Sequence, residues 1–181
     1  MIDKSISNPK LFFINNILIG ENTIKIKRTY NDIYTIFRLK KEMSDEVIYE
    51  VKSCLENEII GGLNFGITYL YPGKVGNEYY MTKGHFHLNK NSTEYYWGIE
   101  GEGILLLMDE SRHIQAERMF PGSLHYIKPN IAHRVCNIGT ILLSFGACWP
   151  SDAGHDYLKI EEQGFSGRII EVNGKPQLVK E

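Results

Sequence analysis

Histidine and glutamate gather in a short stretch of this sequence, "GHFHLNKNSTE", which ends at Glu94. His85 and His87 are separated by one residue, and on a β-strand that spacing points both imidazoles to one face and Phe86 to the other. The polar loop after His87 can return the chain as the next strand and place the Glu94 carboxylate beside the pair. The stretch therefore predicts three polar groups that face one point.

A fourth candidate is His133 in "PNIAHRVCN", where a turn at Pro129 and Asn130 can feed a strand that carries the imidazole to the same point. Three neutral imidazoles and a carboxylate suit a borderline divalent ion such as Fe, Mn, Ni, Co or Zn, with coordination positions left open. A single histidine is more often an ordinary polar residue, but this combination is far more specific. We predict one divalent metal ion per subunit, bound by the set His85, His87, Glu94 and His133.

The elements that must position these residues are mostly strands. From Val47 onward, β-rich runs alternate with Gly, Pro and Asn, which is typical of a sandwich or barrel. The runs are "VIYEV", "LNFGITYLYP", "EYYMT", "EYYWGIEG", "GILLLM", "SLHYIKP", "HRVCN" and "ILLSFGACW". No strand–helix–strand alternation supports a parallel sheet. One helix is expected over Thr29–Ser44, with Thr29 and Asp32 in capping-box spacing.

The length of 181 residues fits a single domain. We expect one all-β domain over residues 1–181, with a core of about 47–164, N-terminal decoration over 1–46, and a strand and polar tail over 165–181. A net charge of -2 gives no general attraction to nucleic acid or to anionic membranes. No stretch reads as a membrane span or a secretory signal, so a cytoplasmic location is expected. Three cysteines fit no metal motif and are expected to be buried thiols.

The metal-site pattern resembles that of the cupin superfamily. Longer stretches, "LNFGITYLYPGKVGNEYYMTKGHFH", "EYYWGIEGEGILLLM", "MFPGSLHYIKPNIAHRVCNIG" and "PSDAGHDY", resemble the cupin-type glucose-6-phosphate isomerases. The resemblance runs from about Tyr49 to about Gly164, in order and nearly without gaps. It implies a cupin-type double-stranded β-barrel (jelly roll) with N-terminal strands and a short helix. It also implies interconversion of glucose 6-phosphate and fructose 6-phosphate, with hydrogen moved between C1 and C2.

That reaction needs a group that moves hydrogen, a stabiliser of the enediolate oxygens and a phosphate anchor. Glu94 is the candidate base, although a hydride shift between the two carbons would need none. Tyr96 shares a strand face with Glu94 and can hydrogen-bond a substrate oxygen. His155 in "AGHDY" resembles a family histidine close to the substrate, suited to ring opening or proton shuttling. For the phosphate, the resemblance implies Tyr49, Thr68, Thr82, Gly84 and Tyr157.

Two alternatives remain open from sequence. One is another metal-dependent cupin enzyme, an oxygenase or an isomerase of a different sugar phosphate, and the other is a non-catalytic sugar-phosphate-binding cupin. Trp149 stands where the family typically has a tyrosine, and it offers an N–H donor but no phenolic acid. His113 and His125 have no ligand partners and are expected to face solvent or make local hydrogen bonds. Cupin barrels often pair through a sheet edge, which makes a homodimer the expected assembly.

Overall fold

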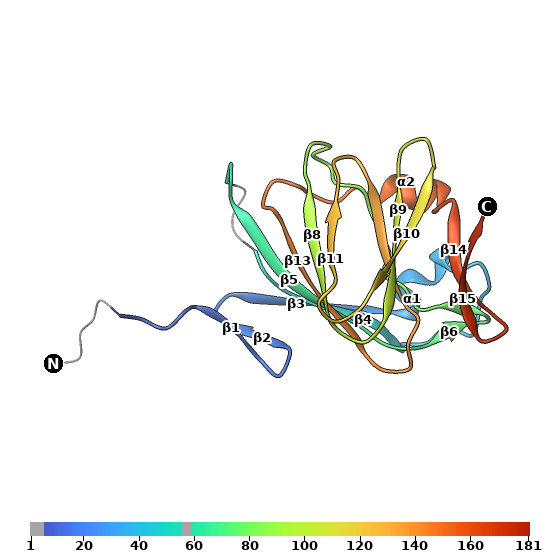
Figure 1. Cartoon of the computed structure of the whole chain (residues 1–181), viewed down its shortest axis with the longest axis horizontal. Coiled ribbons are helices and arrows are strands. Elements are labelled where there is room, and N and C mark those ends of the chain that lie inside the picture. The colour runs from blue at the N-terminus through green and yellow to red at the C-terminus, as the bar shows by residue number, and fades with distance from the viewer. Residues whose placement is uncertain (1–5, 56–58) are drawn as a thin grey trace.

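The computed structural model describes residues 6–55 and 59–181. Its main sheet has six antiparallel strands in the order β11-β8-β13-β5-β4-β3. These strands are β3 (Thr23–Thr29), β4 (Val47–Cys54), β5 (Leu63–Leu70), β8 (Glu94–Glu100), β11 (Leu124–Ile127) and β13 (Leu143–Pro150). The sheet is strongly twisted, as Figure 1 shows, and its concave face forms one wall of a barrel.

The opposing sheet has the order β10-β9-β12. Its strands are β9 (Gly103–Met108), β10 (Ile114–Met119) and β12 (Ala132–Asn137). Two further segments extend it through isolated antiparallel bridges: Met81 and His85 pair with β12, and Phe86 pairs with Asp156. The segment 81–87 therefore lies between β12 and the chain near Asp156, although most of it is too irregular to count as a strand. The predicted all-β, cupin-type barrel is confirmed.

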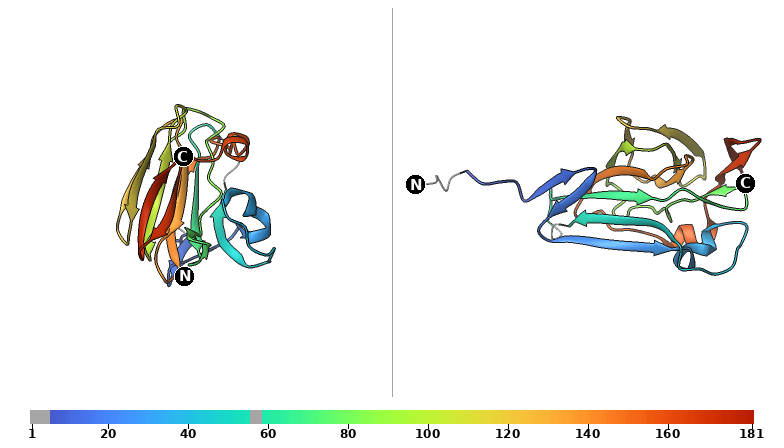
Figure 2. Two further views of the ribbon diagram at one scale, coloured as in Figure 1. Left: turned by 90° about the vertical axis from the view of Figure 1, so that its right-hand side faces the viewer. Right: turned by 90° about the horizontal axis from the view of Figure 1, so that it is seen from below.

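Smaller elements close the two ends of the barrel. The hairpin of β1 (Leu11–Ile14) and β2 (Ile17–Gly20) lies to one side in Figure 1, and a four-stranded sheet lies at the opposite end. That sheet consists of β6 (Lys74–Val75), β7 (Glu78–Tyr79), β14 (Gly167–Val172) and β15 (Lys175–Lys180). The right-hand view in Figure 2 also shows the hairpin and the C-terminal strands at opposite ends. Among the helices of the described residues, none has the length and apolar character needed to cross a bilayer.

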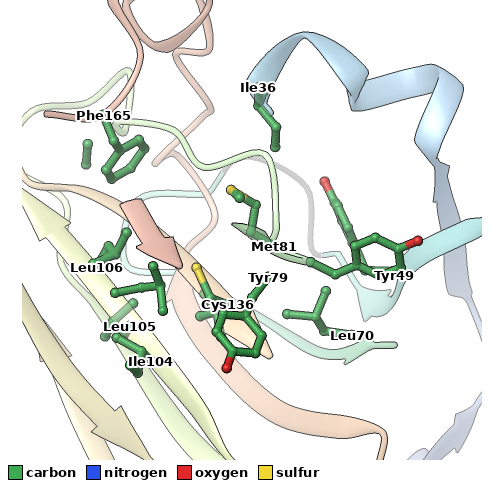
Figure 3. Close-up of a cluster of buried hydrophobic side chains, with 14 of the residues drawn as sticks. Ile36, Tyr49, Leu70, Tyr79, Met81, Ile104, Leu105, Leu106, Cys136 and Phe165 are labelled. Atoms are coloured by element: carbon green, nitrogen blue, oxygen red, sulfur yellow. The ribbon is translucent and has the colours of Figure 1, made fainter. Parts of the chain in front are cut away.

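The core fills the space between the sheets with side chains from both. Figure 3 shows Leu70 of β5 and Tyr79 of β7 approaching Leu105 of β9 and Cys136 of β12. Leu70, Leu105 and Cys136 are completely buried. Phe165 closes the layer next to Leu106. Burying such side chains stabilises each by about 1.5–3 kcal/mol relative to exposure, which fixes the relative position of the two sheets.

The helix expected over Thr29–Ser44 is wrong in its length. The helical part consists of α1 (Tyr30–Ile33) and the 3₁₀ turn η1 (Tyr34–Ile36), after which residues 37–39 form a bend and residues 40–46 have no regular secondary structure. The capping box at Thr29 and Asp32 is present. The helix ends early because the Lys40 ammonium donates to the carbonyls of Tyr34, Thr35 and Phe37, which stabilises an open turn in place of further helical hydrogen bonds.

Other differences from the expected strands are local. The expected polar tail forms β15, which pairs with β14 along its whole length. Of the run "EYYMT", only Glu78 and Tyr79 form a strand. Three elements were not expected from the sequence: β6, β10, and the helix α2 (Leu158–Gln163) that follows the "AGHDY" stretch. Residues 1–5 of the expected N-terminal decoration lie outside the described part.

Candidate metal and substrate site

The four predicted metal ligands converge at the floor of the barrel. One nitrogen from each of His85, His87 and His133 and one oxygen from Glu94 all lie within 4.8 Å of one another. Oε2 of Glu94 is 3.1 Å from Nε2 of His133 and 3.3 Å from Nε2 of His87. The ring centroids of His85 and His133 are 4.3 Å apart. The two separate sequence stretches therefore form one cluster.

Backbone pairing explains why the two stretches meet. The N–H of His133 donates to the carbonyl of His85 at 3.1 Å, and the N–H of His85 donates back at 3.4 Å. This short antiparallel ladder places the two imidazoles side by side. Glu94 is the first residue of β8, in the facing sheet, and its neighbour in the ladder is Ile127 of β11. The site is thus built from both walls of the barrel.

The cluster has the chemistry of an unsatisfied metal site. Nε2 of His85, His87 and His133 and Oε2 of Glu94 are buried without a hydrogen-bond partner. Buried polar atoms are normally paired, so four that face one another require a common partner. On the far side of the rings, Nδ1 of His87 contacts the Ser92 carbonyl at 3.4 Å and Nδ1 of His133 contacts the Ile131 carbonyl at 3.1 Å. A carbonyl only accepts, so Nδ1 carries the proton and each Nε2 lone pair points into the cluster.

The electrostatics of the cluster also suit a cation. Burial, together with the neighbouring imidazoles, lowers the pKa of His85 well below its usual value, so this imidazole is neutral. Burial alone would raise the pKa of the Glu94 carboxyl, but the facing nitrogens of His133 and His87 lower it overall. The cluster therefore presents a neutral imidazole at His85 and an ionised carboxylate at Glu94, which are the forms that bind a divalent ion.

A cavity of about 210 Å³ opens from this cluster. It is lined by the residues expected for substrate and phosphate binding: Tyr49, Thr68, Thr82, Gly84, Tyr96, His155 and Tyr157. His85, Glu94 and His133 also line it, whereas His87 lies behind them in the cluster. The structure therefore brings the expected catalytic, phosphate-binding and metal-binding residues together around one space.

Thr82 and Gly84 lie in the irregular segment beside β12. The N–H of Val135 donates to Oγ1 of Thr82 at 3.1 Å, which leaves the hydroxyl hydrogen of Thr82 free to donate to a ligand. Gly84 has a φ of 76°, and a Cβ there would lie 3.0 Å from the carbonyl oxygen of His133. Only glycine allows the backbone to pass this close to the metal-binding strand.

The phenol groups around the cavity are protonated at neutral pH. Burial raises the pKa of Tyr49 to about 12. Burial and the nearby Glu94 carboxylate raise the pKa of Tyr96 well above its usual value. The Tyr96 ring stands edge-on to His133, with 5.6 Å between ring centroids. Both hydroxyl groups are therefore available as hydrogen-bond donors.

The "AGHDY" stretch reaches the site through the bridge between Phe86 and Asp156. His155 lies against the metal cluster, with its ring centroid 4.4 Å from that of His85. Its ring stacks on Tyr157 at 5.7 Å and an angle of 5°. Oδ1 of Asp156 accepts a hydrogen bond from the N–H of Leu158 at 3.1 Å, at the start of α2. Asp156 thus stabilises the turn before α2.

Trp149, the residue that departs from the family pattern, also lines the cavity. Gly66 lies directly below its six-membered ring, because a Cβ at Gly66 would be 3.1 Å from Cη2 of Trp149. The indole therefore rests on a position without a side chain. The indole of Trp149 contributes apolar surface to the cavity wall on the side of β13.

Three positively charged residues near the cavity were not singled out from the sequence. Arg28 and Lys83 line it. Arg134 is buried beside it and donates to the Lys83 carbonyl, from Nε at 3.2 Å and from Nη2 at 2.5 Å. Its guanidinium lies over the Phe165 ring, 4.3 Å from the centroid, and burial lowers its pKa to about 10. Arg134 thus fixes the backbone between Thr82 and Gly84, a role that no sequence spacing signals.

The expectation for the remaining two histidines is confirmed. His113 is exposed. His125 is buried, with Nδ1 2.7 Å from Oε2 of Glu117 and Nε2 3.0 Å from Oγ of Ser123. It makes the local hydrogen bonds that were one of its two expected states. It lies outside the metal cluster and the cavity.

Known proteins with similar sequences share one name. The family model described as "Glucose-6-phosphate isomerase (GPI)" matches residues 24–180. The glucose-6-phosphate isomerase of Thermococcus litoralis is 41% identical over 172 residues, which cover 92% of this chain and 90% of that protein. The glucose-6-phosphate isomerase of Thermococcus kodakarensis is 45% identical over 135 residues, which cover 75% of this chain and 71% of that protein. The chain therefore belongs to the glucose-6-phosphate isomerase (GPI) family, in its cupin-type form.

Proposed function

We propose that this protein is a metal-dependent aldose–ketose isomerase that interconverts glucose 6-phosphate and fructose 6-phosphate. One observation carries the proposal: the four buried, unpaired ligand atoms adjoin a cavity that hydroxyl groups and the backbone of Gly84 also line. A phosphorylated sugar needs both a centre for chemistry and an anchor for its phosphate. Membership of the isomerase family supports this reading of the cavity.

The proposed cofactor is one divalent ion per subunit, Fe, Mn, Ni, Co or Zn, held by His85, His87, Glu94 and His133. Nitrogen and carboxylate donors of this kind accept several borderline metals. When bound, such an ion supplies Lewis-acid polarisation of substrate oxygens. The neutral His85 imidazole and the ionised Glu94 carboxylate support the proposal, because neither group has to lose a proton before it binds the metal.

Glu94 is proposed as the base that takes a proton from C2 or C1 and returns it to the other carbon. Its carboxylate is ionised at neutral pH and lines the cavity, so it is in the form that accepts a proton. Tyr96 is proposed to donate a hydrogen bond to the oxygen on which negative charge develops. A hydride shift remains the competing route, and a Glu94 variant discriminates the two.

His155 is proposed to assist ring opening of the sugar. Burial is the main cause that lowers its pKa, so the imidazole is neutral and can accept a proton from the anomeric hydroxyl. Its stacking on Tyr157 holds the ring over the cavity. Tyr49, Thr68, Thr82, Gly84 and Tyr157 are proposed as the phosphate anchor.

The assembly, boundaries and location follow as further proposals. We propose a single domain over residues 1–181 that works in the cytoplasm as a homodimer, without nucleic-acid or membrane partners. The β1–β2 hairpin supports the dimer, because the large apolar side chains of Phe12, Phe13, Ile14 and Ile17 are at least two-fifths exposed. Contiguous exposed apolar side chains of this kind are typical of subunit interfaces.

The decisive experiment removes bound metal with a chelator and restores individual divalent ions. Conversion of fructose 6-phosphate into glucose 6-phosphate is then followed with a coupled dehydrogenase assay. We expect no turnover by the metal-free protein and turnover with at least one restored ion. Absence of turnover with every ion would contradict the isomerase proposal, and a requirement for oxygen would favour an oxygenase instead.

A further inference from the structure

Arg28 lines the cavity from the edge strand β3. It pairs with Tyr49 of β4 in the antiparallel register, and directly opposed residues extend to the same face of a sheet. Its side chain therefore lines the cavity together with Tyr49. Lys27, one residue earlier, pairs with Glu50 and faces the opposite side of the sheet.

Among the described residues, Arg28 acts on the Asp32 carboxylate through its charge but forms no ion pair with it: the pKa of Asp32 is lowered mainly by hydrogen bonds from Thr29 and less by Arg28. No carboxylate among those residues forms an ion pair with its guanidinium, and its one side-chain hydrogen bond is a long one of 3.4 Å from Nη1 to the Lys27 carbonyl. The other cation of the cavity is already engaged, since Nζ of Lys83 is 2.6 Å from Glu161 and 4.6 Å from the centre of the Tyr157 ring. Among the described cations that line the cavity, Arg28 is therefore the one whose N–H donors are least used by the protein.

The charge of Arg28 reaches the proposed phosphate anchor. It lowers the pKa values of Tyr49 and Tyr157, against the stronger opposite effect of burial. Glu94 is the one carboxylate among the described lining residues of the cavity. The charge of Arg28 therefore acts on two side chains of the proposed phosphate anchor, Tyr49 and Tyr157.

We propose that Arg28 binds the phosphate of the substrate and is a specificity-determining residue that selects phosphorylated over neutral sugars. This inference rests on the proposed function, because it takes a sugar phosphate as the ligand. A guanidinium offers two parallel N–H donors that match two phosphate oxygens, which hydroxyls and a single backbone N–H do not.

The test compares Arg28→Met with Lys27→Met in the full-length, metal-loaded protein. Both variants remove one positive charge from the same strand, but only the first removes it from the cavity. The probe is glucitol 6-phosphate, an open-chain sugar phosphate that has no carbonyl and cannot be isomerised. Its dissociation constant is measured by calorimetry, and KM and kcat for fructose 6-phosphate are measured alongside.

For Arg28→Met we expect binding of glucitol 6-phosphate to weaken by about 10- to 100-fold, the effect of losing a hydrogen-bonded charge contact. KM should rise by a similar factor while kcat changes little, because the contact is made equally in the ground and transition states. Arg28→Lys should fall between the wild type and Arg28→Met, since it keeps the charge and loses the two-pronged geometry. Lys27→Met should bind like the wild type.

Other outcomes separate failure of this inference from failure of the proposed function. If the wild-type protein converts fructose 6-phosphate and Arg28→Met binds the probe as well as Lys27→Met does, the role of Arg28 is wrong and the isomerase proposal stands. If the wild-type protein binds the probe without turning over substrate, the isomerase proposal fails and the Arg28 comparison still decides this one. A wild-type protein that does neither overturns both. If Arg28→Met does not fold, Arg28→Lys decides: binding equal to the wild type overturns the bidentate contact.

Discussion

At the scale of single residues, Glu94 connects the metal cluster to the proposed hydrogen transfer. Its carboxylate lies between two imidazoles and also lines the substrate cavity. A residue in this position can be a ligand, a base or both. The distinction decides whether the protein itself moves the proton.

Glu94→Gln tests the base role while keeping the size of the side chain. We expect kcat/KM to fall by about 10²- to 10⁴-fold, the range for a lost acid–base group, because the amide cannot accept a proton. Bound metal is measured by elemental analysis of the same sample, so that loss of the metal is seen separately. Glu100→Gln, at the exposed end of the same strand, removes an equal charge and should leave activity unchanged. A Glu94 variant that keeps its metal and its rate would favour the hydride shift.

At the scale of elements, the irregular segment 81–87 depends on Gly84. The backbone there has a φ of 76°, and an added Cβ would lie 2.8 Å from Cε2 of Phe165 and 3.0 Å from the His133 carbonyl. The segment is held by β12 on one side and by the Asp156 backbone on the other. Any side chain at Gly84 would therefore displace the segment that carries Thr82 and His85.

Gly84→Ala should destabilise the protein more than Gly122→Ala does. Both glycines have a positive φ, but a Cβ at Gly122 would meet no atom within 4 Å. Gly122→Ala should cost about 1–2 kcal/mol for the left-handed backbone alone. Gly84→Ala should cost about 1–3 kcal/mol more because of overpacking. Urea unfolding measures both, and equal losses would show that the segment moves without strain.

Most elements around the site could be predicted from the sequence, because their signals are local. The spacing of His85 and His87 on either side of Phe86 predicts that both imidazoles lie on one face of the strand, and this prediction needs no knowledge of neighbouring strands. The helix predicted over Thr29–Ser44 is too long because the capping box at Thr29 marks where a helix starts but not where it ends. The end depends here on Lys40, whose ammonium binds the carbonyls of the turn. The sequence predicted that His85 and His133 approach one point, but it did not predict the backbone pairing between them. Hydrogen bonds between two distant segments produce no periodic pattern in the sequence of either segment.

The positively charged residues around the cavity could not be predicted from the sequence. The stretch "TIKIKRT" alternates charged and apolar residues, and it reads as an ordinary solvated edge strand. Which of its cations faces the cavity depends on the register with β4, which pairs Arg28 with Tyr49. Register is set by contacts across the sheet, so Arg28 and Lys27 are indistinguishable until the fold is known.

At the scale of the whole molecule, the segment between β3 and β4 connects the N-terminal strands to the barrel. Tyr30, Ile33 and Phe37 are buried against the core. A polar network joins the end of the segment to the barrel. Oε1 of Glu46 accepts from the Tyr80 hydroxyl at 2.7 Å, and the Lys41 ammonium is 2.6 Å from the same hydroxyl. The segment therefore holds β3, and with it Arg28, in place.

This network predicts how stability depends on pH. The Lys41 ammonium, 2.5 Å from Oε2 of Glu46, is the main cause that lowers the pKa of the Glu46 carboxyl, with a smaller contribution from Tyr80. A carboxyl whose pKa is lower in the folded state adds stability above its unfolded value of 4.5, and this stability is lost as the pH falls through the folded pKa. Because Glu46 is about half exposed, the contribution should be only about 0.5–1 kcal/mol.

Glu46→Gln should therefore lower the free energy of unfolding at pH 7 by that amount, and the difference from the wild type should shrink as the pH is lowered through 4 and vanish near pH 3. Glu42→Gln is the matched control, because Glu42 is exposed four residues away and forms no ion pair among the described residues. Urea unfolding at pH 7, 4 and 3 measures the three proteins. A Glu46 effect that persists undiminished at pH 3 would mean that the carboxyl acts through hydrogen bonds that survive protonation. The segment between β3 and β4 would then be held on the barrel by packing and hydrogen bonding, with no contribution from charge.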